Sequence, residues 1–510
     1  MTNSENSKRI VKNTSMMYVR MLLTMAVSLY TSRIVLNTLG VVDFGVYNVV
    51  GGIVMMFSFL NSSMSSATQR FLSFELGKRD YVRFSKVFSM SVNIHSIIAI
   101  LIFILAETIG LWFLNAKLVV PAERMVAANW VYQFSVFAIM LSIMNVPYNA
   151  VIIAYERMDV YAYISIVEVV LKLMIVFALE WIGLDKLKLY SALVFCVGTI
   201  VFFIYRIYSK RNFSETNYHF FWDKPLFVTL MNYAGWNLFG NIAAVTMGQG
   251  INIMLNLFMG PAVNAARAIA FQVNSAVSGF VSNFQLALNP QIVKSYAAED
   301  LKYMHQLIFQ GSKYSFFLFF AISLPIILET EYILKIWLKV VPEYTIIFTQ
   351  LVILNILIDT LSGPLITAAQ ASGKIKVYQG VIGGLLLFIL PVSYIFLKNG
   401  FEPQITHLIS IVISLISFII RLIILKKLVQ LKITDFLFEV FLKTFLVSSF
   451  AVVLPLLVRW FFAESLQRFI IVSITSLVSA FVTIYKIGLN QSEKVILLHA
   501  SKNIWNRIVK

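Results

Sequence analysis

The sequence has little charge and almost no cysteine. Only 13% of its 510 residues are charged, and Cys196 is the single cysteine. One cysteine excludes a disulfide framework, and with five scattered histidines it leaves no spacing typical of a metal-binding cluster. Because an ordinary soluble domain is about a quarter charged, the chain lacks the polar residues that would cover a water-soluble protein of this length.

Apolar residues are abundant instead. They make up 59% of the chain, and the mean hydropathy is +0.83. A helix needs roughly 20 mostly apolar residues to cross about 30 Å of hydrocarbon, and in lipid a helix satisfies its own backbone hydrogen bonds. We therefore predict an all-α polytopic membrane protein with about 14 spans, near residues 14–38, 44–69, 88–114, 125–153, 161–182, 188–209, 227–257, 262–290, 311–330, 343–369, 378–397, 403–425, 440–461 and 467–487.

The positive charge is unevenly distributed. The net charge is +17, and of the 41 lysines and arginines 28 lie at the termini or in even-numbered connections, 9 in odd-numbered connections and 4 inside spans. Cytoplasmic loops carry such an excess, so we expect both termini in the cytoplasm and no nucleic-acid partner. The tail 491–510 mixes basic and apolar residues, which is typical either of an amphipathic helix on anionic lipids or of a disordered segment.

Two segments of the sequence resemble each other. "NVPYNAVIIAYERMDVY" (145–161) is echoed by "SGPLITAAQASGKIKVY" (362–378), and similar positions farther upstream recur at a nearly equal offset. The matched pairs are Pro147 with Pro364, Arg157 with Lys374, Tyr161 with Tyr378, Gly40 with Gly260, and Asp80 with Asp300. We predict two parallel-repeat six-helix lobes, 1–209 and 210–425, followed by two extra spans and the tail in 426–510.

A longer segment resembles a known family. "SRIVLNTLGVVDFGVYNVVGGIVMMFSFLNSSMSSATQRFLSFELGKRD" (32–80) and the turn after the fourth span are similar to signatures of bacterial polysaccharide flippases. These proteins belong to the multidrug/oligosaccharidyl-lipid/polysaccharide (MOP) superfamily, of which the Wzx-type lipid-linked O-unit translocases are one branch. The resemblance implies a transporter, not an enzyme. Such a protein moves a polyprenyl-(di)phosphate-linked oligosaccharide, the repeat unit of O-antigen, capsule or exopolysaccharide, across the bacterial inner membrane by alternating access, with polysaccharide assembly proteins as further partners.

Four cations inside predicted spans are candidates for contacting the phosphates of such a substrate. They are Lys172, Arg267, Arg33 and Arg20. Ionisable residues in spans are costly and therefore candidates for function, although snorkelling to the membrane surface or pairing of Lys172 with Glu168 is an alternative. In related lipid II flippases, arginines in spans one, two and eight line the cavity. Arg33 and Arg267 lie in comparable regions, but span two has no arginine before Arg70, which puts shared contacts in doubt.

Buried acids and amides are the remaining candidates. Coupling to H⁺ or Na⁺ would require a carboxylate, for which Asp359, Glu168 and Glu107 are candidates; we expect no other cofactor. The chain has no "GxxxxGK[ST]" phosphate loop of an ATPase. Amides crowd the seventh and eighth spans, where they form either interhelical hydrogen bonds or a glycan-facing wall: Asn237, Asn241, Gln249, Asn252, Gln272 and Asn274.

Two other functions compete with the flippase. A cation-coupled multidrug exporter of the same superfamily would usually have twelve spans and an acid-lined cavity, and the predicted 14 spans and buried cations disfavour it. A membrane-embedded polysaccharide polymerase or ligase would carry a large periplasmic loop. No odd-numbered connection here is that long, so this enzyme class is the weaker alternative.

Overall fold

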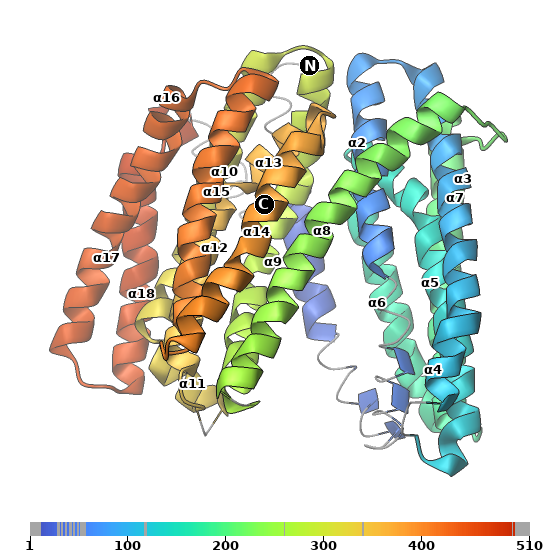
Figure 1. Ribbon diagram of the computed structural model, residues 1–510, viewed down its shortest axis with the longest axis horizontal. Coiled ribbons are helices and arrows are strands. Elements are labelled where there is room, and N and C mark those ends of the chain that lie inside the picture. Colours follow the sequence, from blue (N-terminus) through green and yellow to red (C-terminus); the bar gives the residue numbers. More distant parts are fainter. Residues whose placement is uncertain are drawn as a thin grey trace, which may run out of the picture. The chain divides into compact units, whose positions relative to one another are not determined.

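The computed structural model contains helices and no strand within the residues it describes (Figure 1). Those residues are 12–27, 31, 34–35, 38–39, 43, 46–47, 50–51, 58–116, 120–259, 261–338, 341–491 and 493–494. The helices are α2 (Ser58–Lys78), α3 (Tyr81–Leu105), α4 (Leu111–Ala116), α5 (Met125–Ala154), α6 (Met158–Trp181), α7 (Lys186–Asn212), α8 (Lys224–Met259), α9 (Pro261–Ala297), α10 (Leu301–Leu328), α11 (Thr330–Leu338), α12 (Thr345–Thr360), α13 (Gly363–Ala371), α14 (Ile375–Lys398), α15 (Ile405–Val429), α16 (Ile433–Phe436), α17 (Lys443–Phe461) and α18 (Leu466–Thr483).

Eleven helical stretches of the described chain are long and apolar enough to cross a membrane. The predictions of an all-α fold and of a multi-pass membrane protein are therefore confirmed. The count of 14 spans is compatible with the structure, because much of the first two predicted spans lies outside the described residues and α9, the eighth, is a 37-residue helix of lower hydropathy.

The internal repeat of the sequence is also a repeat of local structure. Helices α6 and α14 are the same length, 24 residues each, and begin at matching positions after the repeated turn. In that turn the N–H of Glu156 donates to Ile153 O (2.8 Å), and the N–H of Gly373 donates to Gln370 O (3.1 Å). Glu156 and Gly373 both have positive φ, 60° and 72°. The second copy has glycine where this left-handed conformation carries no steric cost.

The two copies differ in length within one span. Helix α5 has 30 residues, whereas the matching stretch Thr345–Ala371, which comprises α12 and α13, has 27. α5 continues through Pro147, whereas the second copy breaks between Thr360 and Gly363. Pro364 therefore sits in the first turn of α13, where a missing N–H costs no helical hydrogen bond.

The chain forms two compact units. Unit 1 comprises Met1–Ile242, Leu286–Asp300 and Ile375–Gly380, and unit 2 comprises Ala243–Gln285, Leu301–Lys374 and Val381–Lys510. The division passes through α8, α9 and α14, each of which contributes one end to unit 1. The lobe limits predicted from the sequence, 1–209, 210–425 and 426–510, stay a prediction, and the tail from residue 495 lies outside the described residues.

Helices α3 and α10 occupy matching positions in the two copies. Each holds a segment that lies farther along the chain. In unit 1, Asn93 of α3 donates to Phe221 O (2.8 Å) and accepts from the Tyr218 hydroxyl (2.8 Å). In unit 2, Lys313 of α10 pairs with both oxygens of Glu493, beyond α18, at 2.8 and 2.9 Å. The two extra helices, α17 and α18, lie side by side (Figure 1), and both also pack against α10.

Candidate functional site

Arg267 is a buried cation near the start of α9 in unit 2. Only 6% of the residue is exposed. Its Nη1 donates to Asn252 Oδ1 of α8, and its guanidinium lies 4.4 Å from the ring centre of Phe271, one turn farther along α9. Within the described residues no carboxylate pairs with Arg267, and its Nε has no hydrogen-bond partner. A buried cation without an acidic partner favours the arrival of an anion.

His407 joins Arg267 at this site, and the sequence did not single it out. The imidazole, at the start of α15, is buried between Phe348 of α12 (ring centres 4.7 Å apart) and Phe271 (6.3 Å). Its Nε2 is buried without a partner among the described residues. The signal in the sequence is weak because His407 lies at the edge of an apolar run, where a lone histidine is not distinctive.

The predicted cations of unit 1 gather on one face of α6. Lys172 pairs with Glu168 at 2.6 Å, as the spacing along the helix predicted, and both side chains are exposed. Arg20 stacks over Tyr161 at 4.8 Å, and its Nη1 donates to Ser165 Oγ at 3.5 Å. Residues 161, 165, 168 and 172 recur at helical spacing, so Arg20 and Lys172 lie along the same face. Arg33 lies outside the described residues.

The other two predicted acids have neutral donors. Asp359, near the end of α12, accepts from Asn355 Nδ2 at 3.0 Å and lies near Arg421 of α15. Glu107 accepts from Gln133 Nε2 at 3.2 Å, within a π-helical turn, Ala106–Gly110. Arg421 is buried and donates to Ser362 Oγ at 2.8 Å. Arg421 lies within the predicted span 403–425, and the structure places it inside α15.

The six amides of the predicted polar wall divide between the units. In unit 1, Asn237 accepts from Gln379 Nε2 (3.0 Å) and Asn241 donates to Ser63 Oγ (3.0 Å). These are hydrogen bonds between helices. The other four lie in unit 2: Asn252 donates to Gln249 Oε1 (3.2 Å), Asn274 accepts from Ser278 Oγ (3.0 Å), and Gln249 and Gln272 are exposed. Exposed amides leave groups available to hydroxyls, but a glycan-facing wall stays a prediction.

A polar cluster in unit 1 surrounds Glu156, in the turn between α5 and α6. Its fully buried carboxylate accepts from Gln291 Nε2 and, at 2.5 Å, from Lys294 Nζ, both on the last part of α9. Its backbone oxygen accepts from Asn13 Nδ2 at 3.1 Å. We call these four residues the Glu156 cluster. It was not predicted, because the sequence offers no reason to pair this turn with a helix so distant along the chain.

No group of three or more potential metal ligands occurs among the residues described. No family model and no curated protein matches the sequence.

Solved structures do resemble this one. An outward-facing multidrug resistance MATE family transporter of the MOP superfamily matches with a TM-score of 0.71 and 13% identity over 83% of this chain and 96% of that chain. A MATE protein in complex with MaD3S matches with a TM-score of 0.70 and 13% identity, covering 83% and 97%. The bent form of the Vibrio cholerae MATE transporter VcmN matches with a TM-score of 0.67 and 16% identity, covering 84% and 98%. The chain therefore has a MATE-like transporter fold.

Proposed function

We propose that this protein is a flippase that moves a polyprenyl-(di)phosphate-linked oligosaccharide from the cytoplasmic to the periplasmic leaflet of a bacterial inner membrane. The proposal joins the sequence resemblance, with its polysaccharide flippase signature, to the MATE-like fold. The glycan would be a repeat unit of O-antigen, capsule or exopolysaccharide, and H⁺ or Na⁺ would couple the cycle.

The main support for an anionic substrate is Arg267. A guanidinium offers five donors and matches the oxygens of a phosphate in a two-bonded geometry. One of its nitrogens bonds Asn252 and another, Nε, has no partner in the described structure. Because Asn252 is neutral, arrival of a phosphate would supply the charge compensation that the described part of the chain leaves open.

We infer that the Glu156 cluster opens and closes during alternating access. The cluster holds the end of α9 to the turn between α5 and α6 within unit 1. Its buried carboxylate makes two charge-assisted contacts, and such hydrogen bonds contribute roughly 1.5–3 kcal/mol each. That magnitude is in the range by which ligands shift the populations of transporter states.

A multidrug exporter is the second candidate. Its support is the multidrug resistance transporter among the similar structures and the carboxylate of Asp359, which a cationic drug or a coupling ion would approach. Arg421 lies near Asp359 and offsets its charge. Arg267 has no such offset within the described residues, so the cationic substrate is the less favoured alternative.

The test is translocation in proteoliposomes of a fluorescent polyprenyl-diphosphate-linked oligosaccharide. We compare wild type with Arg267→Ala, Arg267→Lys and Lys172→Ala. Lys398→Ala is the matched control, because Lys398 is an exposed cation at the end of α14. We expect Arg267→Ala to lower the rate at least ten-fold and Arg267→Lys to retain part of it. Equal rates for wild type and both Arg267 variants, with folding intact, would contradict the role of Arg267.

A further inference from the structure

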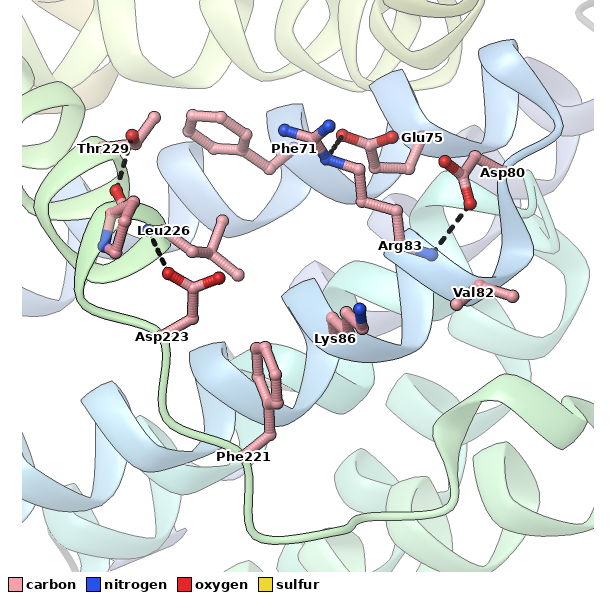
Figure 2. A pocket seen from close by; sticks show the side chains of 11 residues that line it. Phe71, Glu75, Asp80, Val82, Arg83, Lys86, Phe221, Asp223, Leu226 and Thr229 are labelled. Atoms are coloured by element: carbon pink, nitrogen blue, oxygen red, sulfur yellow. Dashed lines mark hydrogen bonds and ion pairs between the residues drawn. The ribbon is translucent and has the colours of Figure 1, made fainter.

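A cavity in unit 1 lies apart from every residue discussed so far as a transport site. Its volume is about 420 Å³, and it is lined by the end of α2, the start of α3 and the stretch from Phe221 to Thr229, which includes the start of α8. Figure 2 shows side chains from these three parts around it, among them Glu75, Arg83, Lys86 and Phe221. In the predicted topology, the connection between α2 and α3 and the segment before α8 lie on the same membrane side as the other basic connections.

Glu75 is the buried acid of this cavity. It is 3% exposed, and its Oε1 pairs with Arg83 Nε at 3.3 Å. Its Oε2 is buried and has no hydrogen-bond partner in the part of the chain that the structure describes. Burial raises the pKa of Glu75, against the attraction of Arg83. A buried carboxylate oxygen without a donor is costly, so the Glu75 carboxylate is the group of this cavity that a ligand with N–H groups would stabilise.

Lys86 is a cation that lines the same cavity. Its Nζ lies 5.7 Å from the ring centre of Phe221, and no carboxylate pairs with it among the described residues. The cavity's remaining acids already accept backbone hydrogen bonds: Asp80 from Arg83 N (2.9 Å) and Asp223 from Leu226 N (3.2 Å). Glu75 and Lys86, which carry this acceptor and this cation, therefore line the same cavity.

This arrangement fits a zwitterion better than an ion of one sign. A purely anionic group would meet three carboxylates, and a purely cationic group would meet Arg83 and Lys86. A molecule that carries an ammonium and a phosphate a few atoms apart would satisfy both uncommitted groups. The faces of Phe71 and Phe221 would contact its methylene carbons and its ammonium.

The surroundings of the cavity indicate that this ligand comes from the membrane. Aromatic side chains beside Phe221 are exposed, Phe220 by 79% and Trp222 by 49%. Aromatic rings gather at the level of lipid headgroups. We propose that the cavity binds the phosphoethanolamine headgroup of a membrane phospholipid, with the ammonium at Glu75 and the phosphate at Lys86. This site is independent of the transported substrate.

The test measures lipid binding to the purified full-length protein by native mass spectrometry and by the lipid-induced shift in melting temperature. The lipids are dioleoyl-phosphatidylethanolamine, its phosphatidylcholine analogue, whose ammonium has no N–H, and its phosphatidylglycerol analogue, which has no amine. We expect the ethanolamine lipid to bind at least ten-fold tighter than the other two. Glu75→Gln and Lys86→Met should each remove this preference. Lys78→Met should keep it, because Lys78 also stacks on a phenylalanine, Phe74, but does not line the cavity.

Several outcomes would overturn the proposal. Equal binding of the three lipids would do so, as would tighter binding of phosphatidylglycerol, which would indicate an anion site. If Glu75→Gln fails to fold, Lys86→Met, which changes a side chain that is not buried, still decides: an unchanged lipid preference in that variant contradicts the assignment. Binding of free O-phosphoethanolamine as tight as that of the lipid would place the ligand in the cytosol and overturn the membrane source.

Discussion

Buried charged residues in this protein differ in whether the described chain supplies a partner of opposite charge. Lys313 and Glu493 are both almost fully buried and satisfy one another, with Glu493 also accepting from Asn490 N at 2.8 Å. Arg267 is buried as well, and its hydrogen-bond partner in the described structure, Asn252, is neutral. The Lys313–Glu493 ion pair therefore has a role in the stability of the fold. Arg267 is the residue for which we propose an anionic ligand.

The Lys313–Glu493 pair predicts a specific double-variant result. Glu493→Gln leaves the Lys313 cation buried without its partner, which costs about 3–5 kcal/mol for a buried pair. Lys313→Met together with Glu493→Gln removes both charges and should recover most of that loss. The measurement is the melting temperature of the purified protein. If the double variant were as unstable as Glu493→Gln alone, the pair would not be the anchor of the segment after α18.

The candidate residues could be predicted from the sequence only in part. Lys172 and Glu168 form the pair that their spacing predicts, because one turn of helix brings the two side chains to one face. Arg267 was a candidate because a cation in an apolar run is costly. His407 and Glu156 were missed because their partners are distant in sequence, and Glu75 because a distant segment near Phe221 completes the cavity that it lines. Whether Lys172, Arg20 and Asp359 face a cavity stays a prediction.

At the scale of elements, close contact between α2 and α9 depends on a glycine in unit 1. A Cβ at Gly77 would lie 2.6 Å from Lys294 O and 2.8 Å from Lys294 Cα, both backbone atoms of α9. Because backbone cannot move aside as a side chain can, Gly77→Ala should separate the two helix ends. We expect a loss of roughly 1–3 kcal/mol, the usual range for overpacking.

The control for Gly77→Ala is Gly235→Ala in α8, where a Cβ would meet nothing within 4 Å. There alanine should be neutral or stabilising by up to about 1 kcal/mol, because alanine favours the helix. Both variants are compared by melting temperature. An unchanged melting temperature for Gly77→Ala would contradict the close approach of α2 and α9.

Some helical features could be predicted from the sequence, and others could not. Apolar runs located the helices and the echo located the repeat, since span length and repeated turns are local properties. The π-helical turn at Ala106–Gly110 was not foreseeable: it accompanies a hydrogen bond from the Tyr132 hydroxyl to Ala106 O (2.7 Å) across two helices. The break between α12 and α13 was likewise hidden, because Pro147 and Pro364 look alike in the sequence.

At the scale of the whole molecule, the Glu156 cluster is the contact we expect to open during transport. Ser295, buried on the same part of α9, reports on it when changed to cysteine in a Cys196→Ser background. Glu156→Gln weakens charge-assisted bonds of roughly 1.5–3 kcal/mol. We therefore expect a soluble maleimide to label the cysteine at position 295 at least ten-fold faster in that variant.

Arg157→Gln is the matched control for this labelling experiment, because it removes an exposed ion pair with Asp159 in the same turn. It should leave the labelling rate unchanged. Equal acceleration by Arg157→Gln and Glu156→Gln would mean that the turn is loosened in general, and no acceleration by Glu156→Gln would mean that the cluster does not control opening.

The most direct measurement of the central claim compares two substrates in one preparation of wild-type proteoliposomes. One is a fluorescent polyprenyl-diphosphate-linked oligosaccharide, and the other is a cationic dye driven by a proton or sodium gradient. A buried Arg267 without a carboxylate partner in the described structure predicts that the anionic glycolipid is translocated and the dye is not. Gradient-driven movement of the dye without translocation of the glycolipid would contradict the flippase and establish the multidrug exporter in its place.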